Sequence, residues 1–207
     1  MSGLAYDFSY PALKPHNPRL APKWLAESIL HQALSQVPRS GHVQVTIDWT
    51  TEGGQHLLVI SLLIGRRGVP IYWRAYDPSM LKGRMHRYER AVIKRAFKLI
   101  FQYVRRGRIR LAADRGFADG DLFDLLRRLK IGFIIRGTGS VTVCLRGQWL
   151  KLSRLRFTTC SRHRDLGRVQ YCQRSPRQLW VTMSRARDRH GQWGVWYLVS
   201  NWALGAQ

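Results

Sequence analysis

Between residues 43 and 136 the sequence switches repeatedly between strand-like and helix-like hydrophobic patterns, and few folds accommodate that order. Apolar residues at every second position predict a strand at 43–48, and a nearly continuous apolar run predicts a strand at 57–64 that is buried on both faces. The strands are expected at 43–48, 57–64, 69–76, 109–113 and 131–136, and the helices at 88–106 and 119–130. The order strand, strand, strand, helix, strand, helix, strand predicts an α/β fold, in which helices flank a mixed sheet.

The regions on either side of this core have different patterns. A short amphipathic helix is predicted at 22–37, after a proline-rich start. After residue 137, short alternating segments rich in basic residues predict a small antiparallel β region, and two stronger strands follow it. The expected segments are 1–40 (a lead-in segment with one short helix), 41–137 (the α/β core), 138–177 (a basic β insertion) and 178–207 (the closing strands). Within the later segments, strands are expected at 141–145, 149–152, 155–157, 169–172, 179–184 and 193–200.

The charge of the chain points to a polyanionic partner. It carries 35 Lys and Arg against 12 Asp and Glu, a formal net charge of +23. Such a field favours the phosphate backbone of a nucleic acid. With 45% hydrophobic residues the chain is too apolar for a disordered basic tail, so we expect it to fold around a core.

The sequence pattern argues against several classes of protein: membrane-anchored, secreted, disulfide-rich and zinc-binding. The longest apolar run, 57–64, is too short to cross a bilayer, so no membrane anchor is expected. The first residues lack the pattern of a signal peptide, which predicts a cytoplasmic protein. The three cysteines are too far apart to indicate a disulfide framework. Cys160-x-x-His163 would be half of a zinc site, but its other half would need Cys144 and Cys172 at irregular distances, so we do not expect zinc.

Two aspartates carry the chemical prediction. Asp48 ends the first predicted strand and Asp114 ends the fourth. The first and fourth strands in this order are commonly adjacent and parallel, which would place the two carboxylates side by side. Neighbouring carboxylates repel unless a cation joins them, and Mg²⁺ prefers hard oxygen ligands while keeping positions for water and substrate phosphates. The pair therefore predicts metal-assisted phosphodiester chemistry, with Mg²⁺ or Mn²⁺.

Three sequence blocks extend this prediction: VTIDWT at 45–50, LAADRGF at 111–117 and YLVSN at 197–201. Together they resemble successive blocks of bacterial insertion-sequence transposases of the insertion sequence 4 type. The resemblance covers residues 40 to 202 and implies an RNase H-like fold with a catalytic DDE triad, in which Asp48 and Asp114 match the two aspartates. It also implies DNA transposition, with element ends and target DNA as partners, a homodimer in the complete protein and a location at the bacterial nucleoid.

The third member of the triad has no counterpart in this sequence. The family carries it as a Glu on a helix after the last strand, whereas Glu27, Glu52 and Glu89 all precede Asp114. The resemblance therefore implies a chain that ends before that helix, that lacks most of an N-terminal DNA-binding region and that is catalytically deficient. Asp165 and Asp188 follow Asp114, but both lie in basic segments without helical spacing.

Other residues have two interpretations. Arg115 is either a phosphate contact or a solvent-exposed arginine, and Glu52 is either a neighbour of Asp48 or, as we favour, a turn residue. The resemblance implies that Trp149 stacks on a base flipped from DNA, but we favour a place in the core of the β region. Asp119, Asp121 and Asp124 begin a predicted helix, where acids favour its dipole, and are expected to be structural.

The function has rivals from two classes. One is another RNase H-like nuclease, and the other is a structural nucleic-acid-binding protein in which Asp48 and Asp114 have no catalytic role. The position of the two carboxyl groups separates these classes. Both enzyme hypotheses fail if the groups lie far apart or on opposite faces of the sheet.

Overall fold

The computed structural model describes residues 22–38, 40–157, 162–187 and 190–204, and it divides into two compact units. Of the described residues, 22–38 and 49–103 belong to the first unit, and 40–48 and those from 104 to 204 belong to the second. Strand β1 (Val43–Glu52) contributes its first six residues to the second unit and its last four to the first. The expected segment boundaries at 41, 138 and 178 stay a prediction.

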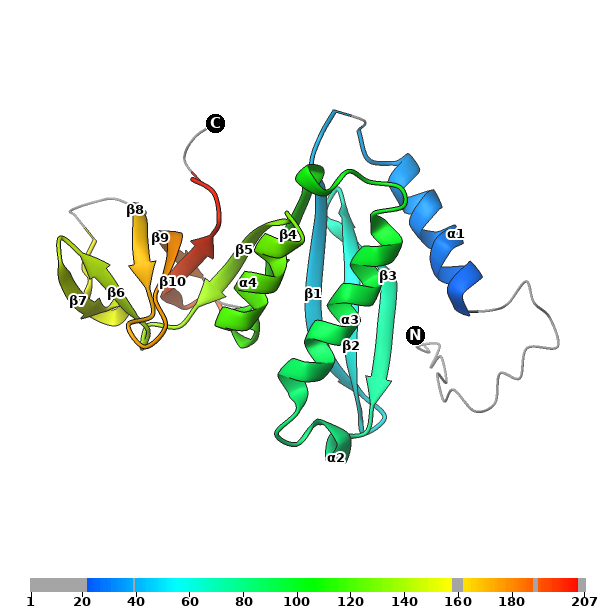
Figure 1. The fold of residues 1–207 in the computed structure, drawn as a ribbon, viewed down its shortest axis with the longest axis horizontal. Coiled ribbons are helices and arrows are strands. Elements are labelled where there is room, and N and C mark those ends of the chain that lie inside the picture. Colours follow the sequence, from blue (N-terminus) through cyan, green and yellow to red (C-terminus); the bar gives the residue numbers. More distant parts are fainter. Residues whose placement is uncertain (1–21, 39, 158–161, 188–189, 205–207) are drawn as a thin grey trace. The chain divides into compact units, whose positions relative to one another are not determined.

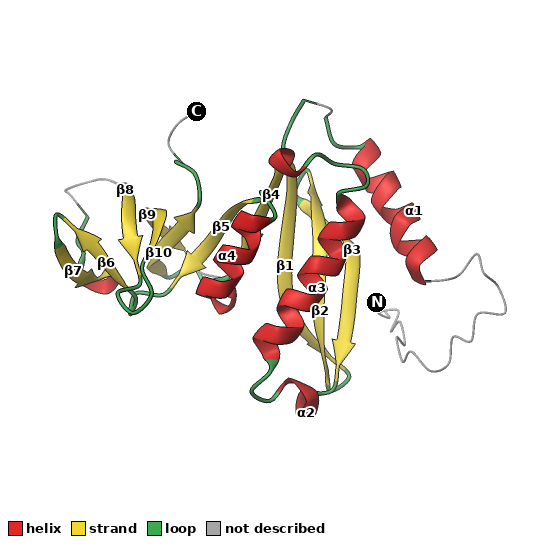
Figure 2. Cartoon of the chain, viewed as in Figure 1, coloured by secondary structure: helices red, strands yellow, loops and turns green. Residues whose placement is uncertain are grey.

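Among the described residues, ten strands form a mixed sheet in the order β3-β2-β1-β4-β5-β10-β9-β8-β6-β7. Helices and strands both contribute to the fold, as Figure 2 shows in red and yellow, so the expected α/β class with a mixed sheet is confirmed. In the part described, no helix combines the length and the apolar character needed to cross a membrane.

The first unit pairs a β-hairpin with helices. Strands β2 (Gln55–Ile64) and β3 (Arg67–Tyr76) are antiparallel, and α3 (Met85–Ile100) packs on both, while α1 (Pro22–Ser35) packs on β3 (Figure 1). A single helical turn, α2 (Pro78–Leu81), precedes α3 and is capped by the Asp77 side chain. The helix at 22–37 and the strands at 57–64 and 69–76 are confirmed in type and place.

Two details of the first unit differ from the sequence pattern. In β2 the side chains of Leu58, Ile60 and Leu62 are fully buried, but the residues between them stay partly exposed, so only one face is completely covered. The long helix ends at Ile100, well before Gly107. It ends there because the N–H groups of Gln102 and Tyr103 donate to carbonyls three residues back, which tightens the last turn.

The second unit begins with three parallel strands. The first residues of β1 pair with β4 (Ile109–Ala113), and β4 pairs with β5 (Gly132–Gly137). Helix α4 (Gly120–Arg128) packs on β5, and the rings of Phe123 and Phe133 stack with centroids 5.2 Å apart. Short 3₁₀ turns, η2 (Arg106–Arg108) and η3 (Arg115–Phe117), precede and follow β4. The strands at 109–113 and 131–136 and the helix at 119–130 are confirmed within two residues at each end.

The rest of the second unit is antiparallel. Strand β5 pairs with β10 (Trp193–Ser200), β10 with β9 (Arg177–Arg187) and β9 with β8 (His163–Tyr171). Strand β8 then pairs with β6 (Thr142–Leu145), which forms a hairpin with β7 (Gln148–Lys151). Asn201 fastens the end of β10 to β5, because its side chain accepts from the N–H of Phe133 and donates to the carbonyl of Ile131, each at 2.9 Å.

The strand predictions in this region need two corrections. Residues 155–157 form no strand, and a 3₁₀ turn, η4 (Leu152–Arg154), precedes them. Gly167 does not separate two strands but lies at an irregularity inside β8, where its φ of 72° is one that glycine adopts without strain. Strand β8 therefore begins at His163, six residues before the predicted start.

Candidate functional site

Asp48 and Asp114 occupy adjacent positions of two parallel strands in the second unit. The β1–β4 register pairs Val45 with Leu111 and Ile47 with Ala113, and each aspartate comes next in its strand direction. Parallel neighbours lie about 4.8 Å apart. Side chains alternate between faces, and Val45, Ile47 and Leu111 point into the core. Both aspartates therefore point to the opposite face, where both are exposed.

Asp48 does not end its strand. Strand β1 continues to Glu52, because the following residues form a hairpin with β2 through the turn at Gly53 and Gly54, whose φ angles are 55° and 79°. Asp114 does follow the last residue of β4, and its backbone is extended before η3 begins. We call this pair, together with Arg136, the carboxylate edge.

Arg136 is the cation that the structure places beside the pair. The β4–β5 register pairs Ala113 with Ile135, so Arg136 comes level with Asp114 on the next strand. Its Nη1 lies 3.5 Å from Asp114 Oδ1, and its guanidinium stacks over the Trp196 ring at 4.5 Å from the centroid. Arg136 was not singled out from the sequence, although its position in a strand following Asp114 was available as a signal. Its charge offsets that of the Asp114 carboxylate.

The carboxylate edge has two of the oxygen ligands that a divalent metal ion accepts. Two aspartate carboxylates on one face are the hard ligands that Mg²⁺ and Mn²⁺ accept, with water or phosphate oxygens in the remaining positions. Among the described residues no group of three or more His, Cys, Asp or Glu gathers in a way that would hold a metal ion. The residues fit a cation bound through two protein ligands. They do not supply the third carboxylate of a DDE triad.

The remaining predicted site residues lie in different places. Arg115 is exposed and directly follows Asp114, at the start of η3. Trp149 is half-buried on β7, opposite Cys144 of β6. Strands β5, β10, β9, β8 and β6 separate β7 from β4 in the sheet, so the structure does not bring Trp149 to the carboxylate edge.

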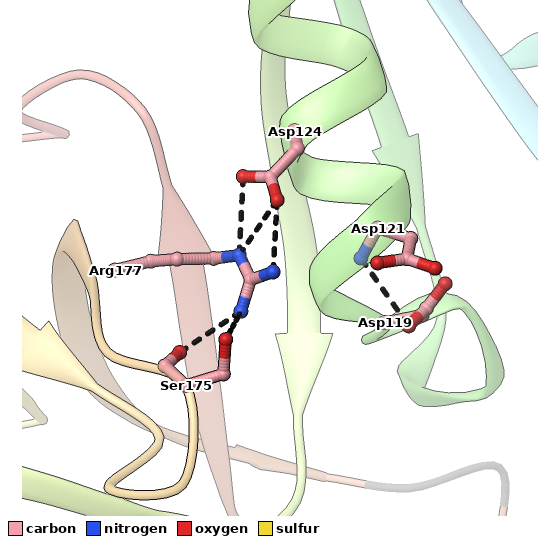
Figure 3. Close-up of polar contacts among 5 residues, drawn as sticks. All are labelled: Asp119, Asp121, Asp124, Ser175 and Arg177. Carbon is pink, nitrogen blue, oxygen red and sulfur yellow. Dashed lines mark hydrogen bonds and ion pairs between the residues drawn. The ribbon is translucent and has the colours of Figure 1, made fainter.

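Two acids near the start of α4 stabilise the helix and its contact with β9. Asp119 caps the helix by accepting from the N–H of Asp121 at 3.4 Å, and Asp124 forms a two-pronged ion pair with Arg177 at the start of β9 (Figure 3). The Arg177 guanidinium also donates to the carbonyl and the hydroxyl of Ser175. Hydrogen bonding to Arg177 holds the pKa of Asp124 below its ordinary value. The structural interpretation of these acids therefore agrees with the contacts of Asp119 and Asp124.

Asp165 is the later aspartate that the structure describes, and its contacts lie within β8 and β9. Asp165 accepts from the N–H of Gly167 at 2.9 Å and from the Thr182 hydroxyl at 3.4 Å, at the irregularity of β8. Asp188 lies outside the described residues, as does Cys160 of the Cys160-x-x-His163 pattern.

A buried polar cluster in the first unit escaped the sequence analysis. The Glu89 side chain on α3 is buried, and it accepts from Trp49 Nε1 at 2.8 Å and meets His86 Nδ1 at 2.8 Å. These contacts satisfy a carboxylate that would otherwise be costly to bury, and they fasten α3 to the end of β1. The available signal was the spacing of Glu89, on the predicted helix, and His86 three residues before it.

Comparison of the chain with models of known protein families gives no match, and neither does comparison with curated proteins.

Proposed function

We propose that this chain is a nucleic-acid-acting protein of the DDE transposase type, in which Asp48 and Asp114 hold Mg²⁺ or Mn²⁺ against a DNA phosphate. The observation that carries the proposal is the parallel register of β1 and β4, which brings the two aspartates to adjacent positions on one exposed face. Carboxylates on opposite faces or distant strands would have excluded both enzyme hypotheses.

The strand order supports an RNase H-like core. From β3 to β5 the order in the sheet is β3-β2-β1-β4-β5. Strands β1 and β4, the first and fourth along the chain, are adjacent and parallel, as the strand and helix pattern predicts. The three blocks that resemble insertion-sequence transposases lie on or at the ends of β1, β4 and β10, within the strand order β1-β4-β5-β10. Two of them carry Asp48 and Asp114, and the third ends in Asn201, whose side chain hydrogen-bonds the backbone of β5.

The residues of the carboxylate edge have distinct tasks in this proposal. Asp48 and Asp114 bind and orient the cation, which when present activates an oxygen for attack on phosphorus. Arg136 balances the charge of Asp114 while the cation is absent, and exposed Arg115 is placed to contact a neighbouring phosphate. Because the described residues supply two carboxylates and not three, we expect cleavage of DNA to be very slow.

A second candidate, a non-catalytic nucleic-acid-binding protein, is favoured by one specific observation. Arg136 already pairs with Asp114, so part of the carboxylate charge is neutralised without any metal. The net charge of +23 suits either function equally well.

Binding of Mn²⁺, measured by electron paramagnetic resonance, separates the two candidates. We expect wild-type protein to bind Mn²⁺, Asp48→Asn to lose this binding, and Arg136→Gln to bind more tightly because a competing cation is gone. Glu52→Gln is the matched control, since Glu52 is an exposed acid four residues further along the same strand. Equal binding by wild-type protein and Asp48→Asn would contradict the metal site and leave the non-catalytic function.

A further inference from the structure

One face of strands β8, β9 and β10 packs in the core along most of its length. At one end of these strands the same face is exposed and carries arginine and tryptophan side chains. Met183 and Tyr197, which face each other in the register, are buried. The next positions on this face pair Arg185 with Val195 and Arg187 with Trp193. The N–H of Arg185 donates to the carbonyl of Arg162, which brings a third arginine to the same end. We call this surface the arginine–tryptophan patch: Arg162, Arg185, Arg187, Trp193 and Val195.

The ring of Trp193 is exposed to solvent and contacts the guanidinium groups of two arginines. Its exposed fraction is 57%, and that of the neighbouring Val195 is 39%. The guanidinium of Arg187 lies 5.1 Å from the ring centroid and that of Arg162 lies 6.0 Å from it. Cation–π contacts of this kind orient the ring, and they do so without burying it. An indole that is both oriented and exposed is a ready surface for stacking.

Within the described ranges, the three arginines of the patch have no acidic partner: no carboxylate forms an ion pair with Arg162, Arg185 or Arg187. The acid nearest along β8, Asp165, is engaged by Gly167 and Thr182, and the strand alternation directs it to the opposite face. Three gathered guanidiniums repel one another, and a chain of phosphates would relieve that repulsion.

We propose that the arginine–tryptophan patch binds an unpaired stretch of nucleic acid, with a base stacked on Trp193 and the flanking phosphates on Arg162, Arg185 and Arg187. The exposed ring favours a single strand over a duplex, because the bases of a duplex are already stacked on each other and present no free faces. A second aromatic ring, Phe157, lies under Arg185 at 4.7 Å and extends the same pattern of ring and cation. This binding does not rest on Asp48, Asp114 or any metal ion.

Fluorescence anisotropy with a labelled oligothymidine tests the proposal, using the full chain in EDTA so that no metal site contributes. We expect Trp193→Leu to weaken binding at least about fivefold, as loss of one stacked base implies. Trp193→Phe should stay close to wild type, because a ring remains. Trp149→Leu is the matched control, since Trp149 is a half-buried tryptophan on β7, outside the patch. Melting temperatures of all variants report whether they fold.

A second variant keeps Trp193 in place and tests the phosphates. For Arg185→Gln we expect the slope of log affinity against log salt to fall by about 0.7, the value for one phosphate contact on a single strand. Three results would overturn the proposal: unchanged oligothymidine binding in both Trp193→Leu and Arg185→Gln, an equal loss in Trp149→Leu, or an equal loss of binding to duplex DNA or heparin in Trp193→Leu. The last would indicate a general polyanion surface in place of a base-stacking one.

Discussion

The carboxylate edge and the arginine–tryptophan patch belong to the same unit, but they are supported in opposite ways. Asp48 and Asp114 stand on strands whose other face is packed, where Ile47 and Leu111 are almost completely buried. The patch is a continuation of the core face itself, beyond the last buried residues of β9 and β10. The comparison indicates that the carboxylate edge depends on the side chains packed on the other face of its strands. The arginine–tryptophan patch depends only on the strands that carry it, so substitution of its residues should cost little stability.

The largest effect should come from removing core beneath the carboxylate edge. Phe133 on β5 is fully buried and stacked on Phe123. Phe133→Ala should lower the free energy of unfolding by about 3–5 kcal/mol, because the cavity cannot collapse against paired strands. Urea unfolding followed by circular dichroism measures this. Trp193→Ala in the patch is the comparison and should cost less than about 1 kcal/mol. Similar losses in the two variants would show that both regions rest on packing.

A smaller effect is expected within β9. Arg177 at its start pairs with Asp124, whereas no carboxylate in the described part of the chain pairs with Arg185 or Arg187 at its end. At pH 7, Asp124→Asn should cost about 1 kcal/mol, since it breaks the partly exposed ion pair with Arg177. Arg187→Gln should change the free energy of unfolding by less than about 0.5 kcal/mol. The measurement is again urea unfolding, and a larger cost for Arg187→Gln would contradict the comparison.

The pH dependence of Asp124→Asn gives the same prediction a second readout. Arg177 holds the pKa of Asp124 below its ordinary value, so the ion pair contributes stability above the unfolded pKa of about 3.9. That contribution is lost as the pH falls through the lower pKa of the folded state. The difference between wild type and Asp124→Asn should therefore be constant from pH 7 to pH 5 and disappear on acidification. A difference that persisted at the lowest pH would assign the cost to packing.

The smallest effect should be found at the carboxylate edge without metal. The Asp114 side chain is 57% exposed and its contact with Arg136 is long, at 3.5 Å. Asp114→Asn should therefore change the melting temperature very little in EDTA, corresponding to less than about 0.5 kcal/mol. With Mg²⁺ added, wild type should melt higher and the variant should not. A large loss of stability in EDTA would make Asp114 a structural residue.

Local patterns predicted the α/β core well, because each depends on residues close in sequence. The alternation of Val43, Val45 and Ile47 identified β1, and the acidic start of α4 marked its first turn within one residue. The predicted strand ends were wrong where pairing with another strand lengthens the strand. The β2 hairpin extends β1 past Asp48, and pairing with β9 extends β8 back to His163. Strand length is set by the partner strand, and a single segment does not contain that information.

The candidate sites show the same division. The residue types and their spacing were sufficient to name Asp48 and Asp114, since a carboxylate that directly follows an apolar strand pattern is visible in the sequence. Tertiary structure decided what lies beside them: Arg136 comes level with Asp114 only because β5 pairs with β4 in parallel register. It also decided that Arg162, Arg185, Arg187 and Trp193 form one surface, because antiparallel pairing joins residues that are far apart in the chain. Periodicity is a local property, whereas register is settled by how whole strands bury their apolar faces together.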